Sequence, residues 1–279
     1  MRGYRIAALG LAAVLTVASL GTAEALLESH TRIVILDDTE FTTENGVRGG
    51  TGTADDPYVI SNWTIDLEHG GECVHIEGVE SFFRIEHCHL RGANGYTARL
   101  VDVRSAEITG SCIQDSVLGI LWEGCERCVL RDCAFGGVDW AALTIIGSTG
   151  CHVAGCLFTE GGPAVGLREA STNNRFVGNV FLGGCRTAIQ LDAQCGGNLL
   201  ACNDFHDTWC VSNSYNRWTD ADGNGSFWSR HRGGDRDGDG VVDTSYRVLG
   251  EAKESDQHPA MTPFHPEAPS EWDLCINDI

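Results

Sequence analysis

The sequence predicts an all-β protein, a right-handed parallel β-helix of about six to eight coils with a cap at each end. Two observations predict this fold. A pattern of apolar residues recurs about every 23 residues, and 35 of the 279 residues are glycine whereas only six are proline. Glycine favours tight turns, and a short unit that cannot bury its own apolar face becomes stable when its copies stack along an axis.

Residues 1–25 are predicted to be a secretory signal peptide. Arg2 and Arg5 precede an apolar run over residues 6–20, and small residues with the pattern Ala23-Glu24-Ala25 follow it. The run is short for a membrane span, and no other apolar stretch approaches the roughly 20 residues that a span requires. We therefore expect an exported protein without a membrane span, located in the periplasm, on the cell surface or outside the cell.

The net charge of the chain excludes one class of partner. The formal charge at pH 7 is -20, with only 19 lysine and arginine residues against 39 aspartate and glutamate residues. Such a charge repels a phosphate backbone and an anionic lipid surface. We expect no nucleic-acid partner.

The recurring pattern has a small residue at its centre. It consists of an apolar residue, two variable residues, a Cys, Ser or Asn, one variable residue and a second apolar residue. Small polar side chains of this kind hydrogen-bond to backbone groups at bends. The six copies are 22 to 24 residues apart and centre on Cys88, Ser111, Cys133, Cys156, Asn179 and Asn203.

An apolar pair with one residue between its members precedes each copy, as in a strand with one buried face. The pair lies eight or nine residues before most copies and five before the second. Each coil should thus contain two short strands that pair in parallel with those of the next coil, about 4.8 Å away, with the right-handed crossover that parallel strands favour. The pairs are Val74/Ile76, Val101/Val103, Ile120/Trp122, Leu143/Ile145, Val165/Leu167 and Ile189/Leu191.

The repeat divides the chain into segments. Residues 26–72 are expected to form an N-terminal cap and the first coil, and residues 73–215 the following coils. Residues 216–279, in which the repeat stops, are expected to form a C-terminal cap. In this register Val101, Ile120, Leu143 and Val165 should lie in a single file.

Two pairs of cysteines are candidate disulfides. Cys128 and Cys151 occupy the same position on adjacent coils, as do Cys133 and Cys156, and a separation of about 4.8 Å is compatible with a disulfide. Either pair could be oxidised in an exported protein. The alternative is that these residues are reduced and pack as small hydrophobic side chains.

The outward positions of the first strand do not form an evident catalytic site. They are His75, Asp102, Leu121, Thr144, Gly166 and Gln190, and the next column, Glu77, Arg104, Glu123, Arg168 and Asp192, places opposite charges on neighbouring coils. Enzymes that cleave acidic polysaccharides need carboxylates and a base on adjacent coils. We therefore assign no catalytic residues.

The C-terminal segment contains the strongest ligand signal. Aspartates stand at positions 1, 3, 5 and 9 of a loop with glycine at position 6, and a backbone carbonyl follows at position 7, which is the spacing of calcium-binding loops. Tyr246 replaces the usual glutamate at position 12, and Asp220-Ala-Asp222-Gly-Asn224 repeats only the beginning of the pattern. The predicted calcium ligands are Asp235, Asp237, Asp239, Val241 and Asp243.

Three histidines suggest a second metal. His75, His87 and His89 fall on the first two coils and would suit copper or zinc if they met. The alternative is that they are ordinary exposed histidines.

Segments at both ends of the chain resemble exported NosD-like right-handed β-helix proteins. The resemblance implies the fold and a module described as carbohydrate-binding and sugar-hydrolysing, in a family named for periplasmic copper delivery to nitrous oxide reductase. The usual aromatic-Trp-Ser-Asp-Tyr run of the family is here Phe227-Trp228-Ser229-Arg230-His231. The resembling segments are residues 45–60 with Trp63, the six coils, residues 227–246 and residues 256–261.

These observations predict an exported structural or glycan-binding β-helix with a calcium-stabilised C-terminal cap. A polysaccharide or a cell-surface glycan is the expected partner. One alternative is a polysaccharide-active enzyme, such as a lyase, hydrolase or epimerase. The other is a periplasmic accessory protein that delivers copper.

Overall fold

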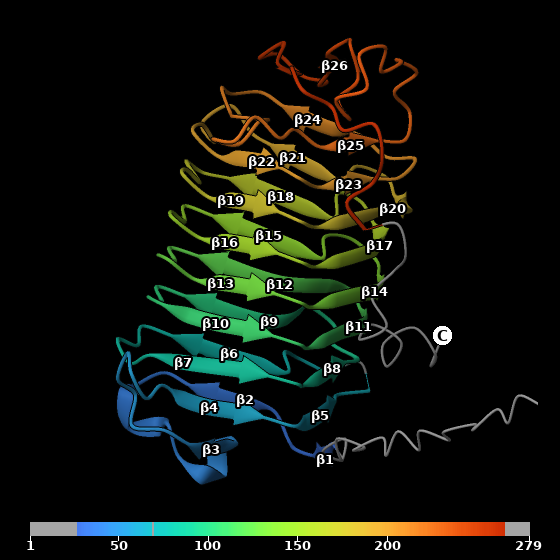
Figure 1. The fold of residues 1–279 in the computed structure, drawn as a ribbon. Helices are drawn as coiled ribbons and strands as arrows, with labels where there is room; N and C mark the ends of the chain where they lie inside the picture. Colours follow the sequence, from blue (N-terminus) through green and yellow to red (C-terminus); the bar gives the residue numbers. More distant parts are fainter. Residues whose placement is uncertain (1–26, 69, 266–279) are drawn as a thin grey trace, which may run out of the picture.

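A computed structural model describes residues 27–68 and 70–265 of the chain, so the predicted signal peptide lies outside the described residues. The chain winds through three long sheets, and each coil contributes one strand to each sheet (Figure 1). We call them sheets A, B and C. Successive coils pair in parallel in all three sheets, and the one antiparallel pair within them is β3 with β4.

The strands have the following bounds. Sheet A consists of β1 (Glu28–Ser29), β5 (Trp63–Asp66), β8 (His89–Arg91), β11 (Cys112–Ser116), β14 (Ala134–Val138), β17 (Leu157–Gly161), β20 (Val180–Cys185), β23 (Asp204–Phe205) and β25 (Phe227–Trp228). Sheet B consists of β2 (Ile33–Ile35), β6 (Val74–Glu77), β9 (Tyr96–Val101), β12 (Leu118–Glu123), β15 (Leu143–Ile146), β18 (Val165–Arg168), β21 (Ile189–Leu191) and β24 (Cys210–Ser212). Sheet C consists of β3 (Val47–Gly49), β4 (Tyr58–Ser61), β7 (Phe83–Glu86), β10 (Ala106–Thr109), β13 (Val129–Arg131), β16 (His152–Ala154), β19 (Arg175–Val177) and β22 (Leu199–Ala201).

Short elements outside the coils lie near the two ends of the stack. The 3-10 helices η1 (Asp38–Glu40) and η2 (Thr43–Asn45) precede β3, which is the edge strand of sheet C. At the other end, β26 (Tyr246–Arg247) and β27 (Ser255–Asp256) form a small antiparallel pair. The part of the chain that the structure describes contains no helix with the length and hydropathy needed to span a bilayer.

The predicted fold class is confirmed, and the predicted number of strands in each coil is wrong. Seven complete coils and a partial eighth coil form a right-handed parallel β-helix, but each complete coil has three strands rather than two. The repeated pattern covers two strands, because its small central residue turns the chain from sheet C into sheet A. Cys88, for example, lies in the bend between β7 and β8.

The register of one coil also differs from the prediction. Ile120 pairs with Leu143, and Leu143 with Val165, as expected. The partner of Ile120 on the preceding coil is Ala98, however, and Val101 pairs with Glu123 instead. The sequence pattern favoured the larger valines over the smaller Ala98.

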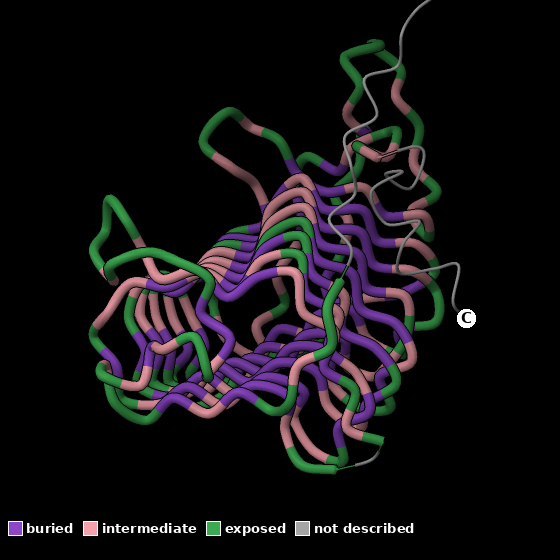
Figure 2. The backbone as a smooth tube through the Cα atoms, turned by 90° about the horizontal axis from the view of Figure 1, so that it is seen from below, coloured by how far each residue is buried: buried purple, intermediate pink, exposed green. Residues whose placement is uncertain are grey.

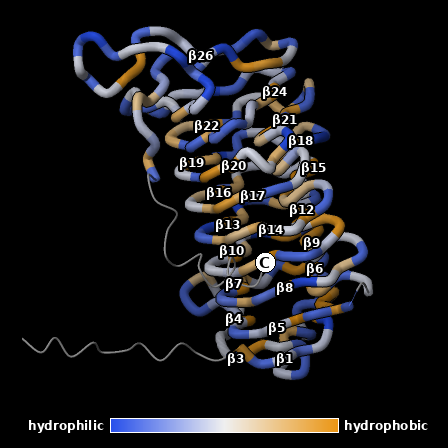
Figure 3. Tube along the Cα trace, turned by 90° about the vertical axis from the view of Figure 1, so that its right-hand side faces the viewer, coloured by the Kyte–Doolittle hydropathy of each residue, from blue (hydrophilic) through white to orange (hydrophobic). Residues whose placement is uncertain are grey.

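Buried stretches recur from coil to coil along the stack (Figure 2), and their apolar side chains form one large core cluster. Because like residues stack on like, aromatic rings of sheet A form a column, which Tyr246 of β26 continues into the cap, with centroids 4.0 to 5.2 Å apart. This spacing matches the distance between paired strands. Hydrophobic segments therefore recur from coil to coil, whereas the cap around β26 is largely hydrophilic (Figure 3). The column contains Phe135, Phe158, Phe181, Phe205, Trp228 and Tyr246.

The bend residues satisfy backbone groups that leave the sheets. The Asn179 side chain accepts a hydrogen bond from the Cys156 backbone N–H at 3.0 Å and donates one to the Val153 carbonyl oxygen at 2.9 Å. In the same way, the Asn203 side chain accepts a hydrogen bond from the Asn179 backbone N–H and donates one to the Phe176 carbonyl oxygen. Both asparagines are fully buried. The column thus links consecutive coils at a corner where backbone groups would otherwise be unpaired.

We predict that Asn179→Ala destabilises the protein by about 1–3 kcal/mol, because it leaves a buried donor and a buried acceptor without partners. Urea denaturation monitored by circular dichroism measures the change. Asn94→Ala is the matched control, since Asn94 is exposed and surface substitutions change stability by less than about 0.5 kcal/mol. Equal stability of the two variants would contradict the structural role of the column.

Candidate metal and ligand sites

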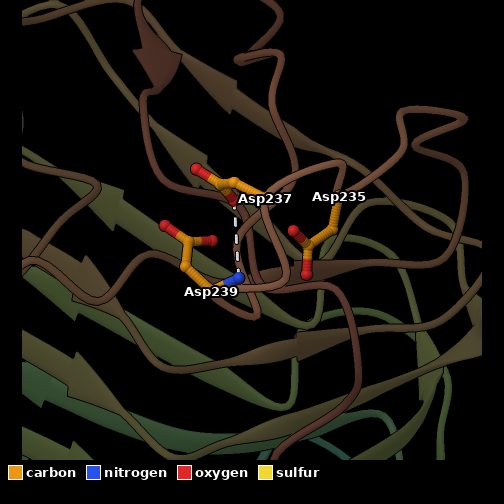
Figure 4. Close-up of side chains that lie close together, drawn as sticks. All are labelled: Asp235, Asp237 and Asp239. Atoms are coloured by element: carbon orange, nitrogen blue, oxygen red, sulfur yellow. Dashed lines mark hydrogen bonds between the residues drawn. The ribbon is translucent and has the colours of Figure 1, made fainter.

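The acidic loop projects from the C-terminal cap between β25 and β26. Oxygen atoms of Asp235, Asp237 and Asp239 lie within 4.8 Å of one another (Figure 4). This is the only group of three or more potential metal-ligating side chains among the described residues. The alternation of aspartates with other residues through a tight turn directs the three carboxylates to one side of the loop.

Hydrogen bonds within the loop fix its shape. The carboxylate of Asp235 accepts from the backbone N–H groups of Gly238 and Gly240 at 2.7 and 2.9 Å. These bonds, led by that of Gly240, lower the pKa of Asp235 from its usual value. Asp239 accepts from the N–H of Val241 at 2.8 Å. The charged form of Asp235 is therefore favoured beside two further carboxylates, an arrangement that suits a cation.

The structure brings together three of the five predicted ligands. Asp243 lies outside the group and accepts from the backbone N–H of Arg236 at 3.2 Å. Val241 is in the same loop, directly after the three aspartates. In the weaker pattern, Asp220 is occupied by the backbone N–H groups of Asp222 and Asn224, and it belongs to no such group within the described residues.

Backbone hydrogen bonds connect the acidic loop to the last coil. Val242 donates to the carbonyl oxygen of Pro259 at 2.8 Å, and Met261 donates to that of Gly240 at 2.9 Å. Ala260, between these two partners, forms a bridge to Phe227 in β25. The shape of the loop is therefore coupled to the packing of the C-terminal segment on the open end of the stack.

A buried carboxylate anchors the same segment. Asp256 is fully buried and accepts hydrogen bonds from the Ser226 N–H at 2.7 Å and from the Trp228 indole N–H at 2.9 Å. Burial raises the pKa of Asp256. The Trp228 ring is stacked between Phe205 and Tyr246. The residues that resemble the NosD-like proteins in this region therefore hold the cap on the coils.

The three histidines proposed for copper do not form a group. His75 lies on β6 in sheet B, and its Nε2 is 3.0 Å from Glu77. His89 lies on β8 in sheet A, with its Nε2 2.7 Å from Gln114. His87 is in the turn before it, and among the described residues no histidine belongs to a potential metal-ligating group.

The corrected register reveals a charged network on the outer face of sheet B. Arg99, rather than Asp102, occupies the outward position between His75 and Leu121. Its guanidinium lies 4.0 Å from Glu77 and 3.7 Å from Glu123, and 3.4 Å from Nε2 of His75. Val101 occupies the position assigned to Arg104, which instead approaches Glu126 at 3.7 Å. Aligning this coil at the eight-residue spacing of its neighbours would have found Arg99.

The four cysteines of the candidate disulfides are free thiols. Cys128, Cys133, Cys151 and Cys156 are all buried and unpaired. In each pair the two residues lie at equivalent bends of adjacent coils, and both sulfurs approach carbonyl oxygens of the preceding coil. The alternative prediction, in which these cysteines are reduced and pack as small hydrophobic side chains, therefore applies.

The other buried thiols among the described residues are also inert in the folded chain. Eleven cysteines are free within the described residues, and ten of these are buried, whereas Cys112 is disulfide-bonded. Burial raises the pKa of Cys73 and of Cys185 to about 12. Cys125 lowers the pKa of Cys128, but a hydrogen bond with Cys151 and burial outweigh this effect and raise the pKa to about 12. Thiols of this kind are neither metal ligands nor nucleophiles at neutral pH.

Two surface hollows have an exposed aromatic side chain. The first, of about 410 Å³, lies on the C-terminal cap and includes Tyr215, Trp218 and Glu254. The second, of about 320 Å³, lies on the wall of the β-helix and includes Asp139, Trp140 and Arg186. Neither was predicted, because the aromatic residues stand outside the repeated pattern and the partners come from other coils.

The coil architecture and its register define a right-handed parallel β-helix protein. The family described as "Right handed beta helix region" matches residues 72–224, which is more than half of the chain, and the chain belongs to this family. The predicted resemblance to NosD-like β-helix proteins is confirmed at the level of family and fold.

A curated relative is the probable ABC transporter binding protein NosD of Pseudomonas aeruginosa. It is 28% identical over 124 residues, which cover 44% of this chain. The match spans only 24% of the length of that relative.

Two solved structures are distantly similar in fold. The alginate lyase from Paenibacillus sp. str. FPU-7 is 10% identical with a TM-score of 0.37, over 71% of this chain and 98% of that chain. ORF18 of Geobacillus virus E2 is 13% identical with a TM-score of 0.39, over 71% of this chain and 47% of that chain. Similarity at this level carries no information on activity.

We predict that iodoacetamide at pH 8 modifies only Cys202 among the eleven free thiols of the folded protein, because the others are buried. The reaction should be slow, since burial and the charge of Asp220 raise the pKa of Cys202 to about 11. In guanidinium chloride without reductant, all eleven thiols should react. Mass spectrometry of tryptic peptides measures both patterns, and Cys202→Ser is the control. A disulfide-linked Cys128–Cys151 or Cys133–Cys156 peptide would contradict the free thiols.

Proposed function

We propose that this protein is an exported, non-enzymatic β-helix with a structural or glycan-binding role, whose C-terminal cap is stabilised by calcium. The observation that carries the calcium proposal is the convergence of the Asp235, Asp237 and Asp239 carboxylates within 4.8 Å. Calcium takes six to eight oxygen ligands. Three carboxylates, the carbonyl of Val241 and water could supply that number.

The attachment of the loop explains how calcium would act on the whole protein. The stack needs a cover on its last coil, since an open end exposes apolar rings and unpaired strand edges. The cover is joined to the acidic loop through Val242 and Met261. A cation that neutralises the carboxylates would stabilise this part of the cap, and with it the final coils.

The glycan-binding part of the proposal is supported by the walls of the β-helix. Trp140 is 66% exposed and lies in a hollow with polar neighbours. Aromatic rings beside hydrogen-bonding groups are typical of small-molecule sites that bind amphipathic ligands. A polyanionic glycan would be opposed by the charge of -20.

We expect calcium to raise the melting temperature by about 5 °C or more when it is present at 100 times its dissociation constant, because ligand binding to the folded state alone contributes about 2.7 kcal/mol at that ratio. Differential scanning calorimetry with calcium and with a chelator measures the shift. Asp239→Asn should lose the shift and should melt higher than wild type in chelator, since one repelling charge is removed.

Asp222→Asn is the matched control, because Asp222 is an exposed loop aspartate outside the group. It should keep the full response to calcium. Identical melting of wild type with calcium and with chelator would remove the proposed metal, and so would an equal shift with magnesium alone.

One observation favours a polysaccharide-active enzyme as the second candidate. His75, Glu77, Arg99 and Glu123 lie together on the outer face of sheet B, and such groups could transfer a proton to or from a sugar. Their charges are paired with one another, which favours a structural role over proton transfer. The copper-delivery alternative lacks a grouped set of ligands among the described residues.

We expect no product when the protein is incubated with neutral or uronic-acid polysaccharides, in assays for new reducing ends and for ultraviolet-absorbing unsaturated ends. Product release by wild type that His75→Ala abolishes and Asn94→Ala retains would replace the non-enzymatic proposal by the enzymatic one.

A further inference from the structure

The wall hollow lies where three neighbouring coils turn from sheet A into sheet B. Asp139 and Trp140 follow β14, Gly161 ends β17 and Gly162 begins the turn after it, and Arg186 follows β20. Backbone hydrogen bonds tie the three turns together: Gly162 donates to the carbonyl oxygen of Trp140 at 2.7 Å, and Arg186 donates to that of Gly161 at 2.8 Å. The positions of the turns are thus fixed by the stack.

The middle turn creates the hollow because it has no side chains there. A Cβ atom on Gly162 would lie 2.7 Å from Cβ of Arg186, and one on Gly161 would lie 2.8 Å from the carbonyl oxygen of Trp140. Trp140 and Arg186 are two coils apart, which corresponds to about 10 Å. A notch of about 320 Å³ therefore separates an indole ring on one side from a guanidinium group on the other.

The polar and aromatic side chains around the notch have no side-chain partners among the described residues. Trp140 is 66% exposed, and across the described residues it makes no aromatic or cation–π contact, whereas Trp63 and Trp209 lie beneath arginines and Trp228 lies within a stack. Asp139 and Arg186 form no side-chain hydrogen bond or ion pair in the described part of the chain. The Asp139 carboxylate, the Arg186 guanidinium and the face of the Trp140 ring are thus available to a ligand as hydrogen-bond acceptor, hydrogen-bond donor and apolar surface.

We propose that this notch is a binding subsite for a neutral oligosaccharide. A pyranose ring has an apolar C–H face, which would stack on the Trp140 indole, and vicinal hydroxyls, which can donate to the Asp139 carboxylate and accept from the Arg186 guanidinium. The volume lies at the lower end of the range for small-molecule sites and suits one or two sugar units. This inference rests on the glycan-binding part of the proposed function and gives it a location and a ligand class.

The chemistry of the notch favours an uncharged sugar chain over other ligands. Asp139 lies in the notch, and the net charge of -20 opposes a uronic-acid polymer. A protein partner would need about 800 Å² of contact surface on each side, which a narrow notch does not offer. The cap hollow is less suitable, because Asn216 and Trp218 already donate to Glu254 there.

The test is a glycan array probed with the wild-type chain, followed by calorimetric titration with the neutral oligosaccharide that binds. Trp140→Ala should weaken binding at least tenfold, and Asp139→Asn and Arg186→Gln about five- to tenfold each. Tyr215→Ala, which removes an exposed aromatic ring from the cap hollow, should leave affinity within twofold. All four side chains are exposed, and circular dichroism checks that the variants fold.

Each other outcome overturns a defined part of the inference. Binding that Trp140→Ala leaves unchanged would remove the subsite and leave the glycan-binding proposal intact. Binding only to uronic-acid chains would overturn the ligand class, and Trp140-dependent capture of a protein would replace the sugar by a protein surface. Binding to no glycan would remove both the subsite and the glycan-binding role, while the calcium test decides the cap independently.

Discussion

The structure depends on the parallel pairing of each coil with the next at a spacing of about 4.8 Å. Because one spacing applies to all three sheets, each side chain packs against the side chain at the equivalent position of the adjacent coil. In the interior this produces the column of rings from Phe135 to Trp228. At the bends it produces the asparagine and cysteine columns, in which one side chain serves the backbone of an adjacent coil. A substitution in any column therefore affects at least two coils.

Stacking leaves two ends that the repeat itself cannot cover, and the caps meet this need with different residues. At the C-terminal end, Trp228 continues the aromatic column and Asp256 satisfies the indole and the backbone beside it. The acidic loop is joined to this arrangement through backbone hydrogen bonds. A divalent cation at the loop would thus strengthen a structure that is already formed, rather than create a fold that is absent without it.

Side chains on the outer walls of the β-helix neither fill the interior nor cover an end of the stack, so they can vary from coil to coil. Sheet B carries a charged network around Arg99 whose members are paired with one another. The turns between sheets A and B carry Trp140 and Arg186, which have no partner within the described residues. Side chains that lack partners and line a notch are available to a ligand. The exposed ion pairs of sheet B already have partners, and such pairs contribute little to stability.

The sequence by itself determined the fold class, most of the register and the grouping of Asp235, Asp237 and Asp239, because each depends on spacing along the chain. It misplaced the coil of Ala98, since an alanine in the interior file carries a weaker apolar signal than the nearby valines. Tertiary structure alone decided that the four candidate cysteines stay reduced, that His75 and His89 lie on different sheets, and that Trp140 and Arg186 line one hollow on either side of a glycine turn. These outcomes depend on the direction of side chains and on contacts between coils, which a one-dimensional pattern does not contain.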